Sequence, residues 1–119
     1  MNYKLDRQLE DQFPFMKDII CECDDGWFGI IQGLCQDLVK AYESCGKDPN
    51  NIVVVQVKEK FGELRFYTDI LIPGADQIIT AAEEESRETC EVCGAPGTQE
   101  LYRGWIQTVC NEHKRRKDV

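Results

Sequence analysis

The chain of 119 residues contains one histidine, His113, and only four prolines. It has no apolar run near the ~18 residues that a membrane-spanning helix needs, which predicts no membrane partner. Its first ten residues are polar and mixed in charge, unlike the apolar segment of a secretory signal. Seven cysteines are an odd number, which disfavours a complete disulfide framework. We therefore expect a protein of a reducing cytoplasm.

Positive charge is also scarce, with 14 Lys and Arg against 22 Asp and Glu and a net charge of −8. An acidic body repels phosphate backbones, so the charge balance disfavours nucleic acid as a partner. The basic run Lys114, Arg115, Arg116 and Lys117 near the C-terminus still allows a nucleic-acid-binding zinc-finger regulator as the least favoured alternative. Such a run also suits the last turn of a helix, where cations complement the helix dipole.

Two pairs of metal-binding residue types stand out in the C-terminal part of the chain. Cys90 and Cys93 form one pair, Cys110 and His113 form the other, and sixteen residues separate the pairs. This spacing is typical of a tetrahedral Cys₃His zinc site. Gly94 follows the first pair directly and suits a tight turn, because glycine adopts left-handed backbone angles easily. The sequence therefore predicts a structural Zn²⁺ ion.

Four protein ligands would fill the coordination shell of this ion and leave no position for water or substrate. With His113 used as a ligand, no histidine remains for acid–base chemistry near neutral pH. The sequence therefore predicts a binding protein that is not an enzyme. We interpret the remaining cysteines as buried or half-buried thiols rather than as a second metal site: Cys21, Cys23, Cys35 and Cys45.

Hydrophobic periodicity predicts the elements of the body, which we place at residues 1–89. Apolar residues recur at three- and four-residue steps from Trp27 to Cys45, which predicts a helix capped by Asp24 or Asp25 and ended by Gly46. Two strands are expected at 52–58 and 63–68, joined by a hairpin connection at 59–62. A second helix is expected at about 75–88, and residues 1–23 form an arm or a short helix.

Residues 90–119 are expected to form the zinc-binding unit, with short strands at 99–103 and 105–109 and a final helix that starts at Cys110 and His113 and runs to about Lys117. Trp105 should cover the metal site or pack against the second helix. The predicted fold is α+β, with two helices packed on a small antiparallel sheet and a C-terminal zinc-ribbon-like unit. Its expected core contains Trp27, Leu34, Leu38, Val55, Val57, Leu64 and Phe66.

The predicted hairpin gathers cations and aromatic side chains in an otherwise acidic protein. Its candidate ligand-binding residues are Lys58, Lys60, Phe61, Arg65 and Tyr67. Arginine suits phosphate or carboxylate and aromatic rings stack on bases, so one hypothesis is an anionic, nucleotide-like ligand. The alternative interpretation is that Glu59 and Glu63 pair with these cations. An exposed face of this hairpin also suits a homodimer contact.

Acidic residues gather in the second predicted helix at Glu83, Glu84, Glu85 and Glu88. We interpret them as a solvated helix face, with a contact to a basic partner as the alternative.

Several segments together resemble a recurring set of small, uncharacterised bacterial and phage-encoded proteins. The segments are CDDGWF at 23–28, KEKFGELRFY at 58–67, CEVCGAPG at 90–97, and GW at 104–105 followed by Thr108 and the Cys110/His113 pair. The resemblance implies a prokaryotic or viral origin and a compact domain with a zinc-finger end, and it implies no catalytic residue. It favours an adaptor or inhibitor that binds a host protein, including one of a bacterial defence or regulatory system.

Overall fold

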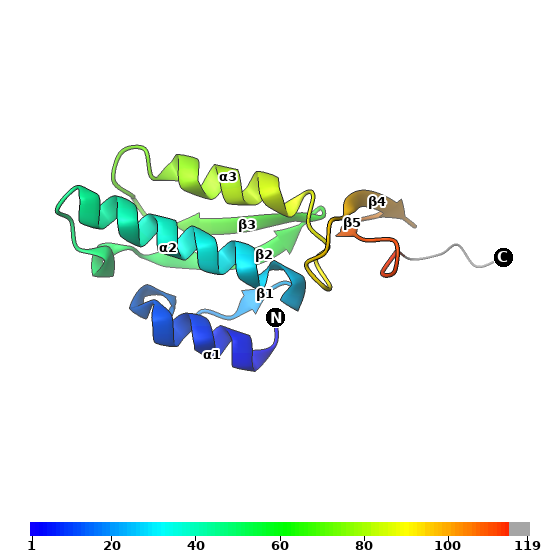
Figure 1. Ribbon diagram of the computed structural model, residues 1–119, viewed down its shortest axis with the longest axis horizontal. Coiled ribbons are helices and arrows are strands. Elements are labelled where there is room, and N and C mark those ends of the chain that lie inside the picture. The colour runs from blue at the N-terminus through cyan, green and yellow to red at the C-terminus, as the bar shows by residue number, and fades with distance from the viewer. Residues whose placement is uncertain (115–119) are drawn as a thin grey trace.

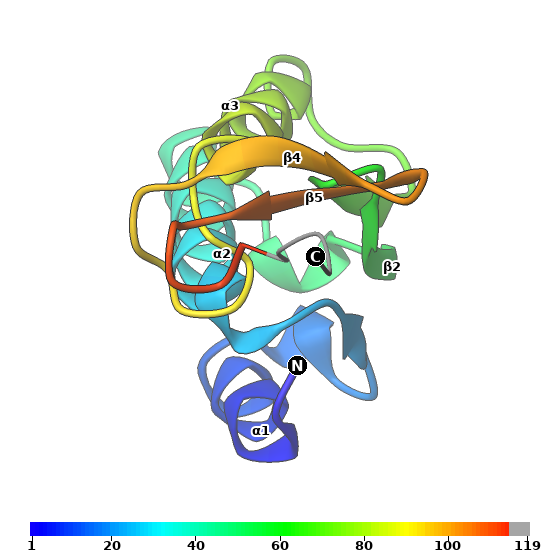
Figure 2. The same cartoon turned by 90° about the vertical axis from the view of Figure 1, so that its right-hand side faces the viewer.

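The computed structural model describes residues 1–114 and shows the predicted α+β architecture. Three helices, α1 (Tyr3–Gln12), α2 (Phe28–Ser44) and α3 (Asp76–Ser86), accompany a sheet formed by β1 (Cys21–Glu22), β2 (Val54–Lys60) and β3 (Glu63–Thr68). Helices α2 and α3 lie side by side along this sheet (Figure 1). A separate hairpin of β4 (Thr98–Tyr102) and β5 (Trp105–Val109) stands at one end of it (Figures 1 and 2).

The sheet has the order β1-β2-β3 and is mixed. Strands β2 and β3 form the predicted antiparallel hairpin, whereas the two-residue strand β1 pairs with β2 in parallel. The N-terminal segment contains a ten-residue helix, α1, in which the Asn2 side chain caps the first turn and Leu9 is buried. Residues 1–23 are therefore ordered, and they add a third helix to the two that the sequence predicted.

Helix α2 buries the apolar stripe that its sequence periodicity predicted, including Ile31, Leu34 and Leu38. The predicted cap is wrong, because a 3₁₀ turn at Asp25–Trp27 precedes the helix and neither aspartate side chain caps it. Asp25 instead accepts a hydrogen bond from the backbone N–H of Asn2. Gly46 has a φ of 68°, as expected for a residue that ends a helix in the left-handed conformation.

The β2–β3 hairpin closes on two residues, Phe61 and Gly62, with φ angles of 54° and 77°. Positive φ at both central positions is the geometry of a type I′ turn, whose twist matches that of the strands. Val57, Leu64 and Phe66 are buried as predicted. The prediction for Val55 is wrong: an irregularity between Val54 and Gln56 shifts the register, so Val54 is buried and Val55 is 62% exposed.

The outer edge of β3 is covered by side chains of α3. The Oγ of Ser86 accepts a hydrogen bond from Leu64 N–H at 2.9 Å, and a carboxylate oxygen of Glu83 accepts one from Phe66 N–H at 3.1 Å. Glu83 is thus a structural residue rather than part of a solvated face, whereas Glu84, Glu85 and Glu88 are exposed. Covering this edge removes a template for pairing with another strand.

Two glycines in α2, Gly29 and Gly33, have no packing role visible in the described residues. A Cβ atom at either position would meet nothing within 4 Å outside the backbone of the helix itself. We expect Gly33→Ala to raise the free energy of unfolding by about 0.5–1 kcal/mol, because alanine favours the helical conformation more than glycine does. Urea denaturation measures this change.

Gly26→Ala is the matched control for that experiment. A Cβ at Gly26 would clash with the backbone carbonyl oxygens of Cys90 and Glu91, so the same glycine-to-alanine change should destabilise the protein here. Equal effects at the two positions would contradict this interpretation of the packing.

Candidate metal centre

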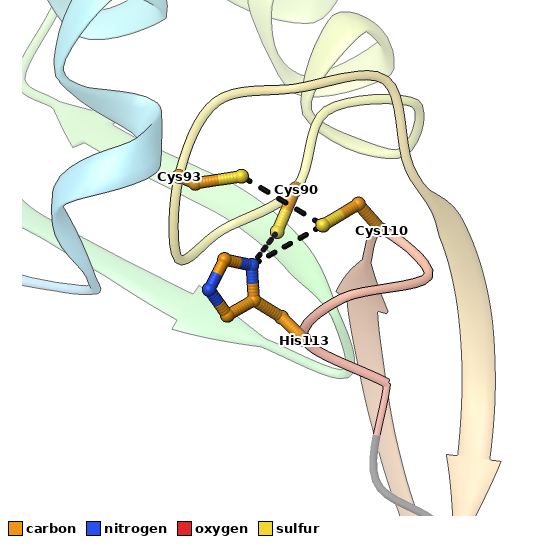
Figure 3. Close-up of side chains that lie close together, drawn as sticks. All are labelled: Cys90, Cys93, Cys110 and His113. Atoms are coloured by element: carbon orange, nitrogen blue, oxygen red, sulfur yellow. Dashed lines mark hydrogen bonds between the residues drawn. The ribbon is translucent and has the colours of Figure 1, made fainter.

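The four predicted ligands come from two turns that face each other. In the first turn, Gly94 N–H donates to the Cys90 carbonyl at 2.8 Å, and Gly94 has a φ of 82°, as the sequence predicted. In the second turn, His113 N–H donates to the Cys110 carbonyl at 3.1 Å, directly after β5. Figure 3 shows the three sulfurs and the imidazole pointing toward a common centre.

The predicted final helix is not seen at its start. Residues 111–113 form a turn, and the last part of the predicted helix, residues 115–117, lies outside the described part of the chain. A single tight turn is sufficient to bring Cys110 and His113 together.

The spacing of the four donor atoms fits a zinc ion. All lie within 4.8 Å of one another. Zn–S and Zn–N bonds of about 2.3 and 2.0 Å arranged tetrahedrally place two sulfurs about 3.8 Å apart and a sulfur and a nitrogen about 3.5 Å apart. The observed Sγ–Sγ distance between Cys93 and Cys110 is 3.7 Å, and His113 Nδ1 lies 3.7 Å from Cys90 Sγ and 3.2 Å from Cys110 Sγ. The residues therefore suit a Cys₃His zinc site, with Nδ1 as the imidazole donor.

The local electrostatics favour a metal-binding thiolate at Cys90. Burial raises the pKa of this thiol, but backbone N–H groups, including those of Cys110 and Cys93, outweigh burial and lower the pKa to about 6. A thiolate is the form of cysteine that binds metal. Cys90 is fully buried, Cys93 is exposed, and Cys110 and His113 are half-buried, so the cluster has one buried and one open side.

The first turn is fixed to the body by the segment that precedes α2. Gly26 N–H donates to the Glu91 carbonyl at 2.7 Å, and the Gly26 backbone lies so close to this turn that only glycine fits. The buried indole of Trp27 donates from Nε1 to the Thr89 carbonyl at 2.9 Å. Trp27 belongs to the core, as predicted, and its indole also fixes the backbone directly before the first metal ligand, Cys90.

Glu91, between the two cysteines of the first pair, is a buried carboxyl group that no sequence motif indicated. It is 6% exposed, and its side chain accepts a hydrogen bond from Asp24 N–H at 3.1 Å. Burial raises the pKa of Glu91 to about 7. The segments CDDGWF and CEVC, which appear together in the resemblance, are therefore direct partners in space.

A second contact joins the β4–β5 hairpin to the β2–β3 turn. Thr108 is fully buried, and its hydroxyl donates to the Gly62 carbonyl at 2.6 Å. A Cβ at Gly62 would lie 3.0 Å from the Cγ2 atom of Ile106. Gly62 of the KEKFG segment and Thr108, which follows the GW pair, are therefore in contact. Their separation in the sequence gave no sign of this contact.

Thr108→Val tests this contact, because valine keeps the shape of threonine and removes its hydroxyl. We expect the free energy of unfolding to fall by about 1–3 kcal/mol, since the Gly62 carbonyl loses its partner in a buried position. Thr98→Val, at an exposed position of β4, should change stability by less than about 0.5 kcal/mol in the same urea denaturation experiment. Equal losses would show that the buried hydroxyl has no special role.

Both predicted positions of Trp105, over the metal site and against the second helix, are wrong. Its side chain is 65% exposed at the start of β5, so it neither covers the metal site nor packs against the second predicted helix, α3. The turn before it, Arg103–Gly104, has φ angles of 48° and 83°, which is again a two-residue hairpin with both angles positive.

The candidate ligand-binding residues of the β2–β3 hairpin are only partly brought together. Lys58 and Arg65 lie directly opposite each other, while Lys60 lies over the ring of Phe61 at the turn, with Nζ 5.7 Å from the ring centroid. Tyr67 lies further along β3, opposite Gln56.

The alternative interpretation of this hairpin holds for one of its two glutamates. Glu63 pairs with Arg65 at 3.1 Å and with Arg87 at 2.9 Å. Glu59 instead accepts a hydrogen bond from Gly62 N–H. The positive charge of the hairpin is thus partly neutralised.

The remaining cysteines provide no second metal site among residues 1–114, where the Cys90, Cys93, Cys110 and His113 cluster is the one suitable group. Cys21, Cys23 and Cys35 are buried, as expected, whereas the expectation for Cys45 is wrong, because Cys45 follows the end of α2 and is exposed. Burial raises the pKa of Cys23 and of Cys35 to about 12, which keeps these thiols protonated. No helix in the described part of the chain has the length and apolar character needed to cross a membrane.

Comparison of the chain with protein-family models, curated proteins and solved structures found no match.

Proposed function

We propose that this protein is a non-catalytic, zinc-stabilised binding protein that acts as an adaptor or inhibitor of a bacterial host protein. The Cys₃His cluster, whose four donor atoms lie within 4.8 Å of one another, supports the zinc-stabilised part of this proposal. Zinc bound there supplies folding energy and leaves no open coordination position. Its role is to hold the β4–β5 hairpin against the body.

The residues that could act as a nucleophile or a base outside a metal site support a role without catalysis. The thiol of Cys35 lies in the core with its pKa raised, and a thiol that stays protonated is a poor nucleophile. His113 faces the metal cluster and is the one histidine in the chain. The contacts between cysteine thiols and this histidine lie within the metal cluster, at Cys90 and Cys110.

A protein partner fits the surface better than nucleic acid does. The net charge is −8, and Lys114 of the basic C-terminal run pairs with Glu100 at 3.3 Å. Two large apolar side chains of the β4–β5 hairpin, Leu101 and Trp105, are 71% and 65% exposed. Tryptophan is enriched among the residues that dominate protein–protein binding energy. The resemblance to small bacterial and phage-encoded proteins supports a host protein as the target.

A pull-down from bacterial lysate tests this proposal, with the zinc-loaded full-length protein as bait. We expect one stoichiometric partner that survives nuclease treatment and moderate salt and is reduced with a Trp105→Ala bait. Repeated recovery of no stoichiometric protein would overturn the adaptor role. Loss of the captured material on nuclease treatment would favour the nucleic-acid alternative instead.

A second candidate function is binding of an anionic, nucleotide-like molecule at the β2–β3 hairpin. Lys58 lies directly opposite Arg65, and Glu63, which also pairs with Arg87, offsets only part of the positive charge gathered there. Calorimetry with phosphate-containing ligands should then detect binding that Lys60→Ala weakens. The absence of binding heat with both proteins would remove this candidate.

A further inference from the structure

A groove of about 470 Å³ runs between α2 and α3. Its floor is apolar, with Ile30, Leu34 and Ile78 among the lining residues. Gly29 and Gly33 of α2 and Ala81 of α3 line its walls and are too small to fill it. The groove is therefore open because small residues occupy the positions where larger side chains would close it.

The two glycines are unfavourable for the helix that contains them, and the described fold gives no compensating contact. A Cβ at Gly29 or Gly33 would have free space, so neither glycine is required by packing within residues 1–114. This contrasts with Gly26 in the same segment, where the chain's own backbone leaves no room for a side chain. Glycines one helical turn apart let another backbone approach a helix closely.

The charges at the groove are all of one sign. Asp37 and Glu85 line it, and both side chains are exposed. Neither carboxylate has an ion pair or a side-chain hydrogen bond within the described residues. Since α2 and α3 run antiparallel (Figure 1), Asp37 lies near one end of the groove and Glu85 near the other.

The length of the groove follows from α2. Gly29 and Asp37 both line it and are eight residues apart, which is about 12 Å at the rise of an α-helix. Two turns of a second helix span this length. Two residues that are seven positions apart on the bound helix lie on the same side and about 10 Å apart. Their side chains could therefore contact the two ends of the groove.

We propose that the groove between α2 and α3 is the docking site for an amphipathic helix of the partner protein, with small and apolar residues facing the groove and basic residues about two turns apart that pair with Asp37 and Glu85. This inference rests on the proposed protein-binding function and names the chemistry of its partner. A helix that binds in a groove contacts it through side chains three, four and seven residues apart. Complementary charges then fix the position of the bound helix along the groove.

A second copy of the chain fits this groove less well than a basic partner does. A symmetric dimer through this face would place each groove against another that carries the same unpaired carboxylates, and like charges across an interface are costly.

The test uses the zinc-loaded full-length protein, labelled with ¹⁵N, and two synthetic helical peptides of identical composition. The first has an alanine- and leucine-rich face with lysines seven residues apart beside it. The second has its lysines moved to the opposite face. We expect the first peptide to shift the amide signals of Gly29, Gly33 and Ala81 and to bind at least about tenfold more tightly than the second.

Two variants of α2 provide the matched control. Gly33→Leu fills the groove and should weaken binding of the first peptide about tenfold or more, while its melting temperature stays at or above that of the unmodified protein. Gln36→Leu adds the same side chain at an exposed position of α2 that does not line the groove, and binding should stay within about twofold.

Three results would overturn the proposal: equal binding of both peptides, unchanged binding to Gly33→Leu, or self-association of the protein that maps to these amides and marks a second copy as the occupant. The lysate pull-down, repeated with a Gly33→Leu bait, separates this inference from the proposed function. A partner retained by that bait would leave the adaptor role intact and place its contact elsewhere. No partner with any bait would remove the adaptor role itself.

Discussion

Replacing Cys93 with serine is expected to abolish stoichiometric zinc binding and to loosen the C-terminal third of the chain. Zinc binding contributes on the order of 10 kcal/mol to folding in small zinc-finger peptides, and losing one of three thiolates removes much of that contribution. Here the effect should be local, because the body has its own hydrophobic core. Amides of residues 90–110 should lose hydrogen-exchange protection, while those of α2 keep most of theirs.

Cys45→Ser is the matched control, because Cys45 is exposed and lies outside the metal cluster. It should keep one zinc per chain and the same melting temperature. A Cys93→Ser protein with unchanged zinc content and unchanged melting would refute the assignment of the cluster. Metal removal with a chelator should reproduce the exchange pattern of Cys93→Ser in the unmodified chain.

Trp27→Ala is expected to cause the largest loss of stability of any single change in the body. Trp27 is fully buried, and replacing a buried aromatic side chain with alanine costs about 3–5 kcal/mol. A domain of this size has a total stability of about 5–15 kcal/mol, so this single change removes a large share of it and should lower the urea midpoint clearly. The change also removes the Nε1 hydrogen bond to Thr89, next to the first metal ligand. Urea denaturation and circular dichroism measure both effects.

Two other substitutions isolate the causes of this loss. Trp27→Phe keeps most of the packing and removes the hydrogen bond, so its cost should be smaller than that of alanine. Trp105→Ala removes an exposed indole and should change stability by less than about 0.5 kcal/mol. Similar losses at Trp27 and Trp105 would contradict the assignment of one tryptophan to the core and the other to the surface.

Local pattern was sufficient to predict the metal ligands and most of the elements. Cys90, Cys93, Cys110 and His113 follow from spacing alone, because a tight turn brings two ligands of each pair together whatever the rest of the fold does. The bounds of β3 also follow, since Leu64 and Phe66 alternate with Arg65 and Tyr67 as one buried face requires.

Tertiary contacts decided the features that the sequence analysis missed or assigned wrongly. Val55 is exposed because a register shift in β2 turns its side chain from the buried face of the sheet to the solvent. A run of β-branched residues gives no sign of such a shift. Glu83 looked like one of several solvated glutamates, yet it pairs with a backbone group of β3. Gly26, Glu91 and Thr108 have roles that depend on residues more than 40 positions away.

A cobalt titration of the metal-free, full-length chain tests the central claim most directly. Three thiolates and one imidazole around one ion should give an end point of one Co²⁺ per chain, intense thiolate charge-transfer absorption and the visible bands of a tetrahedral ion. No saturable binding, or a spectrum with solvent coordinated to the cobalt, would contradict a closed structural site and the non-catalytic function built on it.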